Sequence, residues 1–263
     1  MSATTQAAPE SRIHISDLTM AYGSTVIQRD LTFDVYSGDI FVIMGGSGCG
    51  KSTLLKHLLG LISPARGDIA YSGESFVRAD DRQRDRMRRR WGITYQSGGL
   101  FSAMTLAENV ALPLSLYTTS NNREIADIVA YKLALVGLAG YQAYYPSEIS
   151  GGMRKRAALA RAIALDPEIL FFDEPSAGLD PISSRLLDDL ILEIKESTGA
   201  TVVMVTHELP SIFAIANNSV YLDAKTRTMI AYGDPRELRD HSDQAVVRQF
   251  LNRERASAPG APA

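Results

Sequence analysis

The stretch GGSGCGKST, residues 45–53, has the residue types and the spacing of a phosphate-binding loop. It fits the pattern G-x-x-x-x-G-K-[ST], and an apolar run, DIFVIM, precedes it as a strand would. Glycines let backbone N–H groups surround phosphates, while the lysine reaches the outer phosphates and the serine can bind Mg²⁺. An ordinary glycine-rich turn is the alternative, which this setting disfavours. The predicted loop comprises Gly45, Gly46, Ser47, Gly48, Cys49, Gly50, Lys51, Ser52 and Thr53.

Two adjacent carboxylates, Asp173 and Glu174, follow the apolar run ILFF. Ligands of open α/β folds bind at the carboxyl ends of the strands, where these side chains are expected. One carboxylate can hold Mg²⁺ through water while its neighbour polarises an attacking water. Solvated loop residues would look the same in isolation, but beside a phosphate loop we interpret the pair as a metal ligand and a base.

Two further polar residues end apolar runs: Gln96 ends GITYQ and His207 ends TVVMVTH. Both are therefore expected at the same edge of the sheet as the carboxylates. A lone histidine is more often structural, and Gln96 is either a ligand of the metal or water, or merely a polar strand end. Taken singly, these two residues leave both interpretations open.

The segment SEISGGMRKRAALARA, residues 147–162, begins a helix in an unusual way. Ser150 suits the N-cap, but Gly151 and Gly152 follow it, and the basic residues 154–156 crowd a turn where the helix dipole is already positive. Glycine permits close approach, and free N–H groups with basic neighbours suggest an anion such as phosphate. A simple capped helix start is an equally good interpretation.

Apolar runs at 39–46, 92–96, 168–174 and 201–208 have the character of buried strands, and helical patterns separate them. This alternation predicts an α/β fold with a parallel sheet.

Other segments add to this core. Residues 12–39 alternate apolar and polar residues and predict an antiparallel sheet, to which 68–76 should add. Residues 106–140 predict an inserted helical layer. Residues 219–235 predict a hairpin, followed by one closing helix to about residue 253.

The composition bounds the function. The chain has 263 residues, is 45% hydrophobic and carries a net charge of -3, which argues against general nucleic-acid binding. Its single cysteine, Cys49, indicates a reducing compartment. Its place near a helix N-terminus favours a lowered thiol pKa, and the alternative is that it is simply a small residue that fits the loop. Residues 11–254 are the expected folded unit, with 1–10 and 255–263 disordered. No apolar run approaches the roughly 20 residues that span a bilayer, so any membrane work is expected through partners.

The segment 78–90, RADDRQRDRMRRR, places seven arginines among three aspartates. It is either a solvated helix face or a surface for anionic lipid headgroups, and the former is favoured.

Counted together, the motifs resemble a known family. In chain order they are Tyr22 before a glycine, the phosphate loop, Gln96, ISGGM, ILFFDE, SAGLD at 176–180, and His207. Their order and spacing resemble the nucleotide-binding subunit of ATP-binding cassette (ABC) transporters over nearly the whole folded chain. The resemblance implies a P-loop NTPase of the ABC ATPase fold, with a RecA-like parallel core, an N-terminal antiparallel β subdomain and a helical subdomain at about 97–165.

The resemblance also implies roles for these residues, with ATP and Mg²⁺ as cofactors and ATP hydrolysis coupled to transport. In this family the SGG turn of one subunit faces the γ-phosphate held by a second subunit, so Ser150, Gly151 and Gly152 are expected to act in trans in a head-to-tail homodimer. The remaining implied roles are adenine stacking by Tyr22, subunit bridging by Asp180, γ-phosphate contact by His207 and Lys51, general base catalysis by Glu174, and Mg²⁺ binding by Ser52, Gln96 and Asp173.

One departure points to a branch of the family. Met153 stands where most members have glutamine, and SGGM together with QSGGLF at 96–101 resembles the ATPases of Mce-type lipid transport, including the maintenance-of-lipid-asymmetry (Mla) system. This implies two permease copies, a periplasmic Mce-domain protein, a small accessory cytoplasmic subunit and a peripheral place on the cytoplasmic face of the inner membrane. A motor for another substrate, or a cytosolic ABC protein without a membrane partner, is the alternative.

Overall fold

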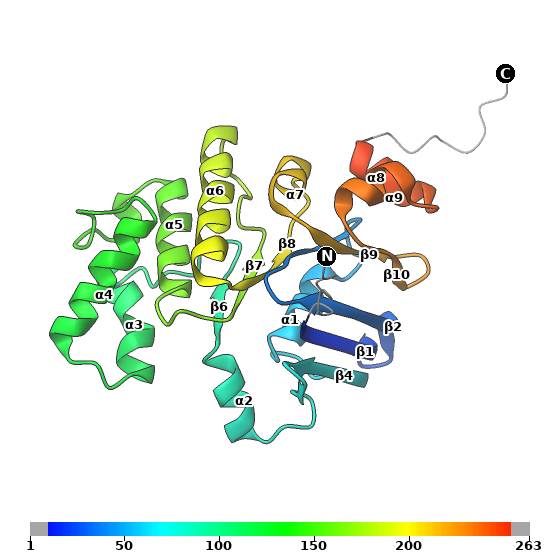
Figure 1. Cartoon of the computed structure of the whole chain (residues 1–263), viewed down its shortest axis with the longest axis horizontal. Helices are drawn as coiled ribbons and strands as arrows, with labels where there is room; N and C mark the ends of the chain where they lie inside the picture. Colours follow the sequence, from blue (N-terminus) through cyan, green and yellow to red (C-terminus); the bar gives the residue numbers. More distant parts are fainter. Residues whose placement is uncertain (1–9, 254–263) are drawn as a thin grey trace, which may run out of the picture.

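The computed structural model describes residues 10–253. The segments expected to be disordered, 1–10 and 255–263, lie outside this part except for Glu10, whose carbonyl accepts a hydrogen bond from the Ser37 N–H at 2.8 Å. The N-terminal strands form one sheet beside a central sheet, and a group of helices extends to one side (Figure 1).

The central sheet contains the four apolar runs as parallel strands, as predicted. It comprises β3 (Ile40–Gly45), β6 (Trp91–Thr94), β7 (Ile169–Asp173), β8 (Thr201–Val205), β9 (Asn218–Asp223) and β10 (Thr228–Tyr232). Their order is β10-β9-β3-β8-β7-β6, and only the pairing of β10 with β9 is antiparallel within this sheet of the described chain. β3, β7 and β8 therefore all end at one edge, where the phosphate loop, the carboxylates and His207 follow.

The N-terminal sheet is antiparallel, also as predicted. It comprises β1 (Ser11–Tyr22), β2 (Thr25–Tyr36), β4 (Arg66–Tyr71) and β5 (Glu74–Ser75), in the order β2-β1-β4-β5. Alternate side chains such as Ile13 and Ile15 point inward and share a core with Phe41 and Phe171 of the central sheet. This packing fixes the N-terminal sheet against the strand that carries the phosphate loop.

Helices cover the central sheet and form the lateral group. They are α1 (Lys51–Leu58), α2 (Asp81–Arg88), α3 (Leu106–Tyr117), α4 (Asn122–Leu135), the 3₁₀ turn η1 (Pro146–Glu148), α5 (Gly151–Ala162), α6 (Pro181–Thr198), α7 (Leu209–Ile215), α8 (Pro235–His241) and α9 (Ala245–Asn252). α3, α4 and α5 lie together in the lateral group (green in Figure 1). In residues 10–253 no helix has the length and apolar character needed to cross a membrane.

The C-terminal segment differs from the prediction of one closing helix. α8 ends at His241, and the Ser242 hydroxyl accepts a hydrogen bond from the Gln244 N–H at 3.3 Å before α9 begins. A serine side chain that bonds the backbone two residues ahead stabilises a turn and interrupts the helix.

The arginine-rich segment 78–90 is largely exposed, which agrees with the favoured interpretation of a solvated helix face, and some of its arginines also bind their own chain. Arg84 donates to the carbonyls of Phe76 and Val77, and Arg90 pairs with both carboxylate oxygens of Glu168. These contacts give the segment a structural role between β5 and β7.

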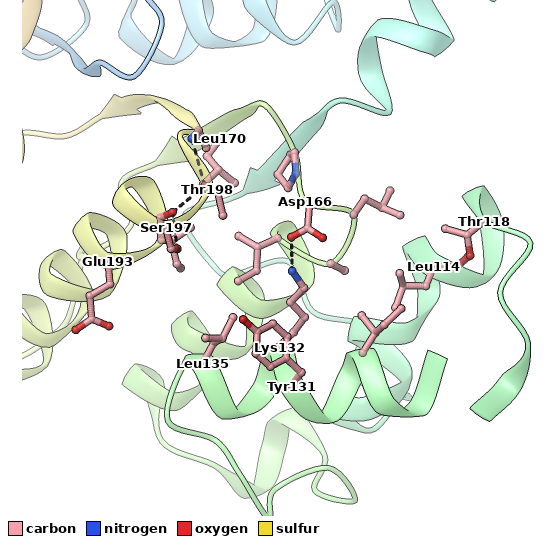
Figure 2. Close-up of a pocket in the computed structure, with 17 residues that line it drawn as sticks. Leu114, Thr118, Tyr131, Lys132, Leu135, Asp166, Leu170, Glu193, Ser197 and Thr198 are labelled. Atoms are coloured by element: carbon pink, nitrogen blue, oxygen red, sulfur yellow. Dashed lines mark hydrogen bonds and ion pairs between the residues drawn. The ribbon is translucent and has the colours of Figure 1, made fainter. Parts of the chain in front are cut away.

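A cavity of about 720 Å³ lies between α4, the loop after α5 and α6 (Figure 2). Lys132 enters it from α4 and pairs with Asp166 at 2.5 Å. Leu170 and Ala200 contribute to its wall, at the amino ends of β7 and β8. The cavity is therefore at the opposite strand ends from the phosphate loop.

Asp188 provides a stability prediction. It lies on α6, is only 4% exposed, and burial raises its pKa to about 6 although Ser211 of α7 opposes the shift. Because this pKa exceeds the unfolded value of about 3.9, the ionised carboxylate destabilises the fold above about pH 6, and the penalty disappears as pH falls below about 4. Asp188→Asn should raise the free energy of unfolding by about 1–3 kcal/mol at pH 7.5.

Denaturant unfolding at pH 7.5 and 4.5 would measure this difference, with a smaller gain at the lower pH. Asp189→Asn is the matched control, because that neighbouring carboxylate is half-exposed and pairs with Arg185. Equal gains at both pH values, or the same gain in the control, would contradict the assignment.

Candidate functional site

The phosphate loop is shaped by two glycines that no other residue could replace without displacement. Gly45 has a φ of 146°, and a Cβ there would lie 2.4 Å from the Leu222 carbonyl oxygen. Gly50 has a φ of 100°, and its Cβ would lie 2.8 Å from the Ile27 side chain. The loop is thus packed closely against its own strand neighbours on the inner side, as close backbone approach requires.

The outer side of the loop is suited to phosphate. Around Gly46 and Gly48 a Cβ would meet no atom of the described chain within 4 Å, and Gly50 caps α1 without a side-chain hydrogen bond. The first N–H groups of a helix capped in this way are available to an anion. Lys51 Nζ donates to the carbonyls of Gly45 and Gly46 at 2.9 and 3.0 Å, which places its charge over the loop.

Cys49 differs from expectation. Its side chain is 1% exposed, and burial raises the pKa of its thiol, although Lys51 opposes the shift. The predicted lowering of the thiol pKa by the helix N-terminus is therefore wrong, because desolvation of the thiolate outweighs the dipole. Cys49 fills space beneath the loop as a small apolar residue.

A residue that the sequence did not single out, Gln28, supports the loop from below. This fully buried side chain of β2 donates from Nε2 to the carbonyl of Cys49 at 2.7 Å and to that of Asp223 at 3.0 Å. It joins the phosphate loop to the end of β9. The only signal in the sequence is a polar residue in an otherwise alternating strand, which does not by itself indicate a partner.

Glu174 and His207 meet at the carboxyl ends of β7 and β8, as predicted for residues at one sheet edge. Glu174 Oε1 lies 2.9 Å from His207 Nδ1, so this nitrogen carries the hydrogen when the carboxylate is ionised. Glu174 has a φ of 50°, and its N–H donates to the Val205 carbonyl at 2.8 Å. Its other carboxylate oxygen is buried and accepts no hydrogen bond from residues 10–253, which leaves it available to a water that attacks a substrate.

Asp173 has the electrostatics of a metal ligand. Burial raises the pKa of its carboxyl group, and the adjacent Glu174 raises it further, while Lys56 and Lys155 oppose the shift. Two carboxylates at a strand end favour a nearby cation, and Ser52 is exposed in the first turn of α1, which follows the adjacent phosphate loop. The residues present therefore fit Mg²⁺ together with phosphate.

The basic residues of α5 donate hydrogen bonds to backbone carbonyls, whereas the sequence suggested that they lie near an anion. Arg154 donates to the Ile149 carbonyl at 2.9 Å, and Arg156 to that of Val136 at 2.8 Å. Lys155 donates to the carbonyls of Gln96 and Glu174. These cations donate to the backbone of their own chain, and the interpretation that the turn faces an anion stays a prediction.

The start of α5 itself is as predicted, with Ser150 as N-cap accepting from the Met153 N–H at 3.2 Å. Beside this turn, a Cβ on Gly152 would lie 3.5 Å from Ser183 Oγ, which donates to Asp180 at 2.6 Å. Asp180 also caps α6, and its hydrogen bonds with Ser183 lower the pKa of its carboxyl group.

No hydrogen bond within residues 10–253 joins the SGG turn or Asp180 to the phosphate loop. Tyr22, expected to stack on adenine, ends β1 with 49% of its surface exposed. The structure therefore brings together Glu174, His207 and, through Lys155, the backbone of Gln96, and it places Lys51 and Asp173 at the same sheet edge. The roles of Tyr22, Asp180 and the SGG turn stay predictions.

A phosphate loop, a strand-end carboxylate pair and a glutamate-bound histidine at one edge of a parallel sheet define a P-loop ATPase. Residues 28–177 match the family model described as ABC transporter. The chain belongs to this family, and its fold is the ABC ATPase fold.

Relatives and solved structures agree with this assignment. The chain is 42% identical to the probable ribonucleotide transport ATP-binding protein mkl of Mycobacterium leprae, over 94% of this chain and 71% of that protein. It is 41% identical to the intermembrane phospholipid transport system ATP-binding protein MlaF of Haemophilus influenzae, over 93% of this chain and 92% of that protein. The dimeric post-hydrolysis structure of the ATP-binding cassette MJ0796, bound to ADP and Pi, matches with a TM-score of 0.75 and 27% identity. The match covers 84% of this chain and 98% of that chain.

The role of Gln28 yields a prediction. Gln28→Leu keeps the side-chain volume but leaves two carbonyls without its hydrogen bonds, so it should lower the free energy of unfolding by about 2–4 kcal/mol. Because the freed carbonyl of Cys49 belongs to the phosphate loop, ATP affinity should fall as well. Thermal unfolding and nucleotide titration would measure both effects. Unchanged stability with unchanged affinity would contradict the role.

Proposed function

We propose that this chain is the ATP-hydrolysing subunit of an ABC transport complex that drives phospholipid transport between the inner and outer membranes. The observation that carries the proposal is the 41% identity to a protein named for intermembrane phospholipid transport, which extends over nearly all of both chains. The SGGM and QSGGLF runs support the same branch.

Hydrolysis is assigned to the residues at the sheet edge. Lys51 and the N–H groups of the loop hold the phosphates, and Glu174 takes the proton of the attacking water. His207 would orient Glu174 by donating from Nδ1, and it would donate from Nε2 to the transferred phosphate when both ring nitrogens carry a hydrogen. Ser52, Gln96 and Asp173 would hold Mg²⁺, which supplies positive charge to the phosphates when it is bound.

The complete site is proposed to need two copies of the chain. Ser150, Gly151 and Gly152 of one copy would face the phosphate loop of the other, with Asp180 beside them. Ser150 and Gly151 are exposed in the structure, and the structure of one matched cassette is that of a dimer in a post-hydrolysis state with ADP and Pi. The free N–H groups of the α5 turn would then contact the anion.

The same proposal includes the partners and the location. Two permease copies, a periplasmic Mce-domain protein and a small accessory cytoplasmic subunit would complete the complex, with this chain peripheral on the cytoplasmic face of the inner membrane. The arginine-rich segment 78–90 and the helices that follow Gln96 would lie toward the permease.

A second candidate is a motor for another substrate, because the mycobacterial relative is named for probable ribonucleotide transport. The chain covers 71% of that protein, compared with 92% of MlaF, so the phospholipid assignment is preferred.

Affinity purification of the tagged chain from detergent-solubilised membranes, with mass spectrometry of proteins and lipids, tests the proposal. A permease, an Mce-domain protein and bound phospholipid should be recovered. Recovery of a permease with a solute-binding protein and no phospholipid would keep the transport motor but reject this cargo. Recovery of no membrane protein would contradict a role in transport.

Glu174→Gln should retain ATP binding and reduce turnover by about 100-fold or more, because the amide cannot accept the proton of the attacking water. Steady-state hydrolysis and binding of radiolabelled ATP would separate these effects. Glu208→Gln is the matched control, since that carboxylate lies 3.6 Å from His207 Nε2 but not at the end of β7, and it should keep most of the activity. Substantial turnover in Glu174→Gln would show that Glu174 is not the base.

A further inference from the structure

Lys155 is the fifth residue of α5 and is half-buried between two segments of the ATPase site. Its Nζ donates to the carbonyl oxygen of Gln96, which follows β6, and to that of Glu174, which follows β7, the latter at 3.3 Å. β6 and β7 are neighbouring parallel strands. One ammonium group thus connects the segments that follow β6 and β7. The side chains of these segments, Gln96 and Glu174, are proposed to bind Mg²⁺ and the attacking water.

This position is electrostatically unfavourable for a helix. The N-terminal turn of α5, which Lys155 directly follows, carries partial positive charge, and burial lowers the pKa of Lys155. The opposing attraction comes from the charges of Glu174 and Asp173, together with the two carbonyl oxygens. The lysine is therefore held by the hydrolytic site rather than by its own helix.

The carbonyl that Lys155 binds belongs to a constrained residue. Glu174 has a φ of 50°, a conformation that costs energy for a residue with a side chain. Its N–H is fixed by the Val205 carbonyl, its carbonyl by the Ala177 N–H and Lys155, and its carboxylate by His207. Of these contacts, only that of Lys155 also reaches the Gln96 segment.

We infer that Lys155 is a positioning residue that holds the Gln96 segment and the backbone of Glu174 in register for ATP hydrolysis. Because α5 also begins with the SGG turn, movement of this helix would shift Gln96 and Glu174 together. This role of Lys155 concerns ATP hydrolysis alone and does not depend on which substrate is transported.

Three variants test the inference in the full-length protein. Lys155→Met removes the donor and keeps the length of the side chain, and kcat should fall about 10-fold, the loss typical of one hydrogen bond to a charged group. KM for ATP should change less than about 2-fold, because the phosphate loop is untouched. Lys155→Arg retains a cationic donor and should restore most of kcat.

Arg156→Met is the matched control. This residue follows Lys155 on the same helix and also donates to two carbonyls, but those of Val136 and Gly137. It should lower the melting temperature at least as much as Lys155→Met while keeping kcat. Steady-state ATP hydrolysis and thermal unfolding of all the variants would be measured together.

A fall in kcat for Lys155→Met that arginine restores and that Arg156→Met does not share would support the inference. Wild-type kcat in Lys155→Met would overturn it. An equal fall in kcat for Arg156→Met would overturn it too, because it would show a general effect of weakening α5. In either of these cases the wild-type chain still hydrolyses ATP, so the proposed function is judged separately.

Discussion

The site depends on the turn with which the chain leaves β7. At Glu174 the backbone enters the left-handed region, and the N–H bonds to the Val205 carbonyl of the adjacent strand β8. This one backbone hydrogen bond sets the direction of the carboxylate and brings it to His207, which follows β8. The parallel pairing of β7 with β8 is therefore the constraint on which the hydrolytic geometry rests.

One buried and one half-buried polar side chain maintain the rest of the site in the same way, by donating to backbone carbonyls. Gln28 reaches the phosphate loop from the N-terminal sheet, and Lys155 reaches the two strand ends from the helical group. A buried carbonyl such as that of Cys49 is costly without a partner, and the bonds from Lys155 connect the ends of β6 and β7. All three parts of the fold are thus connected to one catalytic edge.

Much of this arrangement could be predicted from the sequence. The strands β3, β7 and β8 are short apolar runs, and parallel strands end at one edge, so the convergence of Lys51, Glu174 and His207 followed from the pattern. The contacts of Gln28 could not be predicted from this pattern. The carbonyl of Asp223 lies 195 positions further along the chain and is reached only through tertiary packing. For Cys49, the lowered thiol pKa was wrong and the alternative of a small residue that fits agrees with its burial, which its position beside a helix N-terminus does not reveal. The break between α8 and α9 depends on one local bond of Ser242, which periodicity does not detect.

The central claim, a hydrolytic site shared by two copies, is tested most directly by cross-linking. Ser47→Cys in one chain and Ser150→Cys in another, both in a Glu174→Gln background, place thiols on the exposed phosphate loop and on the exposed SGG turn. The native Cys49 is 1% exposed and contributes little background reaction. The account predicts a covalent dimer that forms only when the two variants are mixed and ATP is present. A mixture that gives no ATP-dependent cross-link, in chains that still bind ATP, would contradict it.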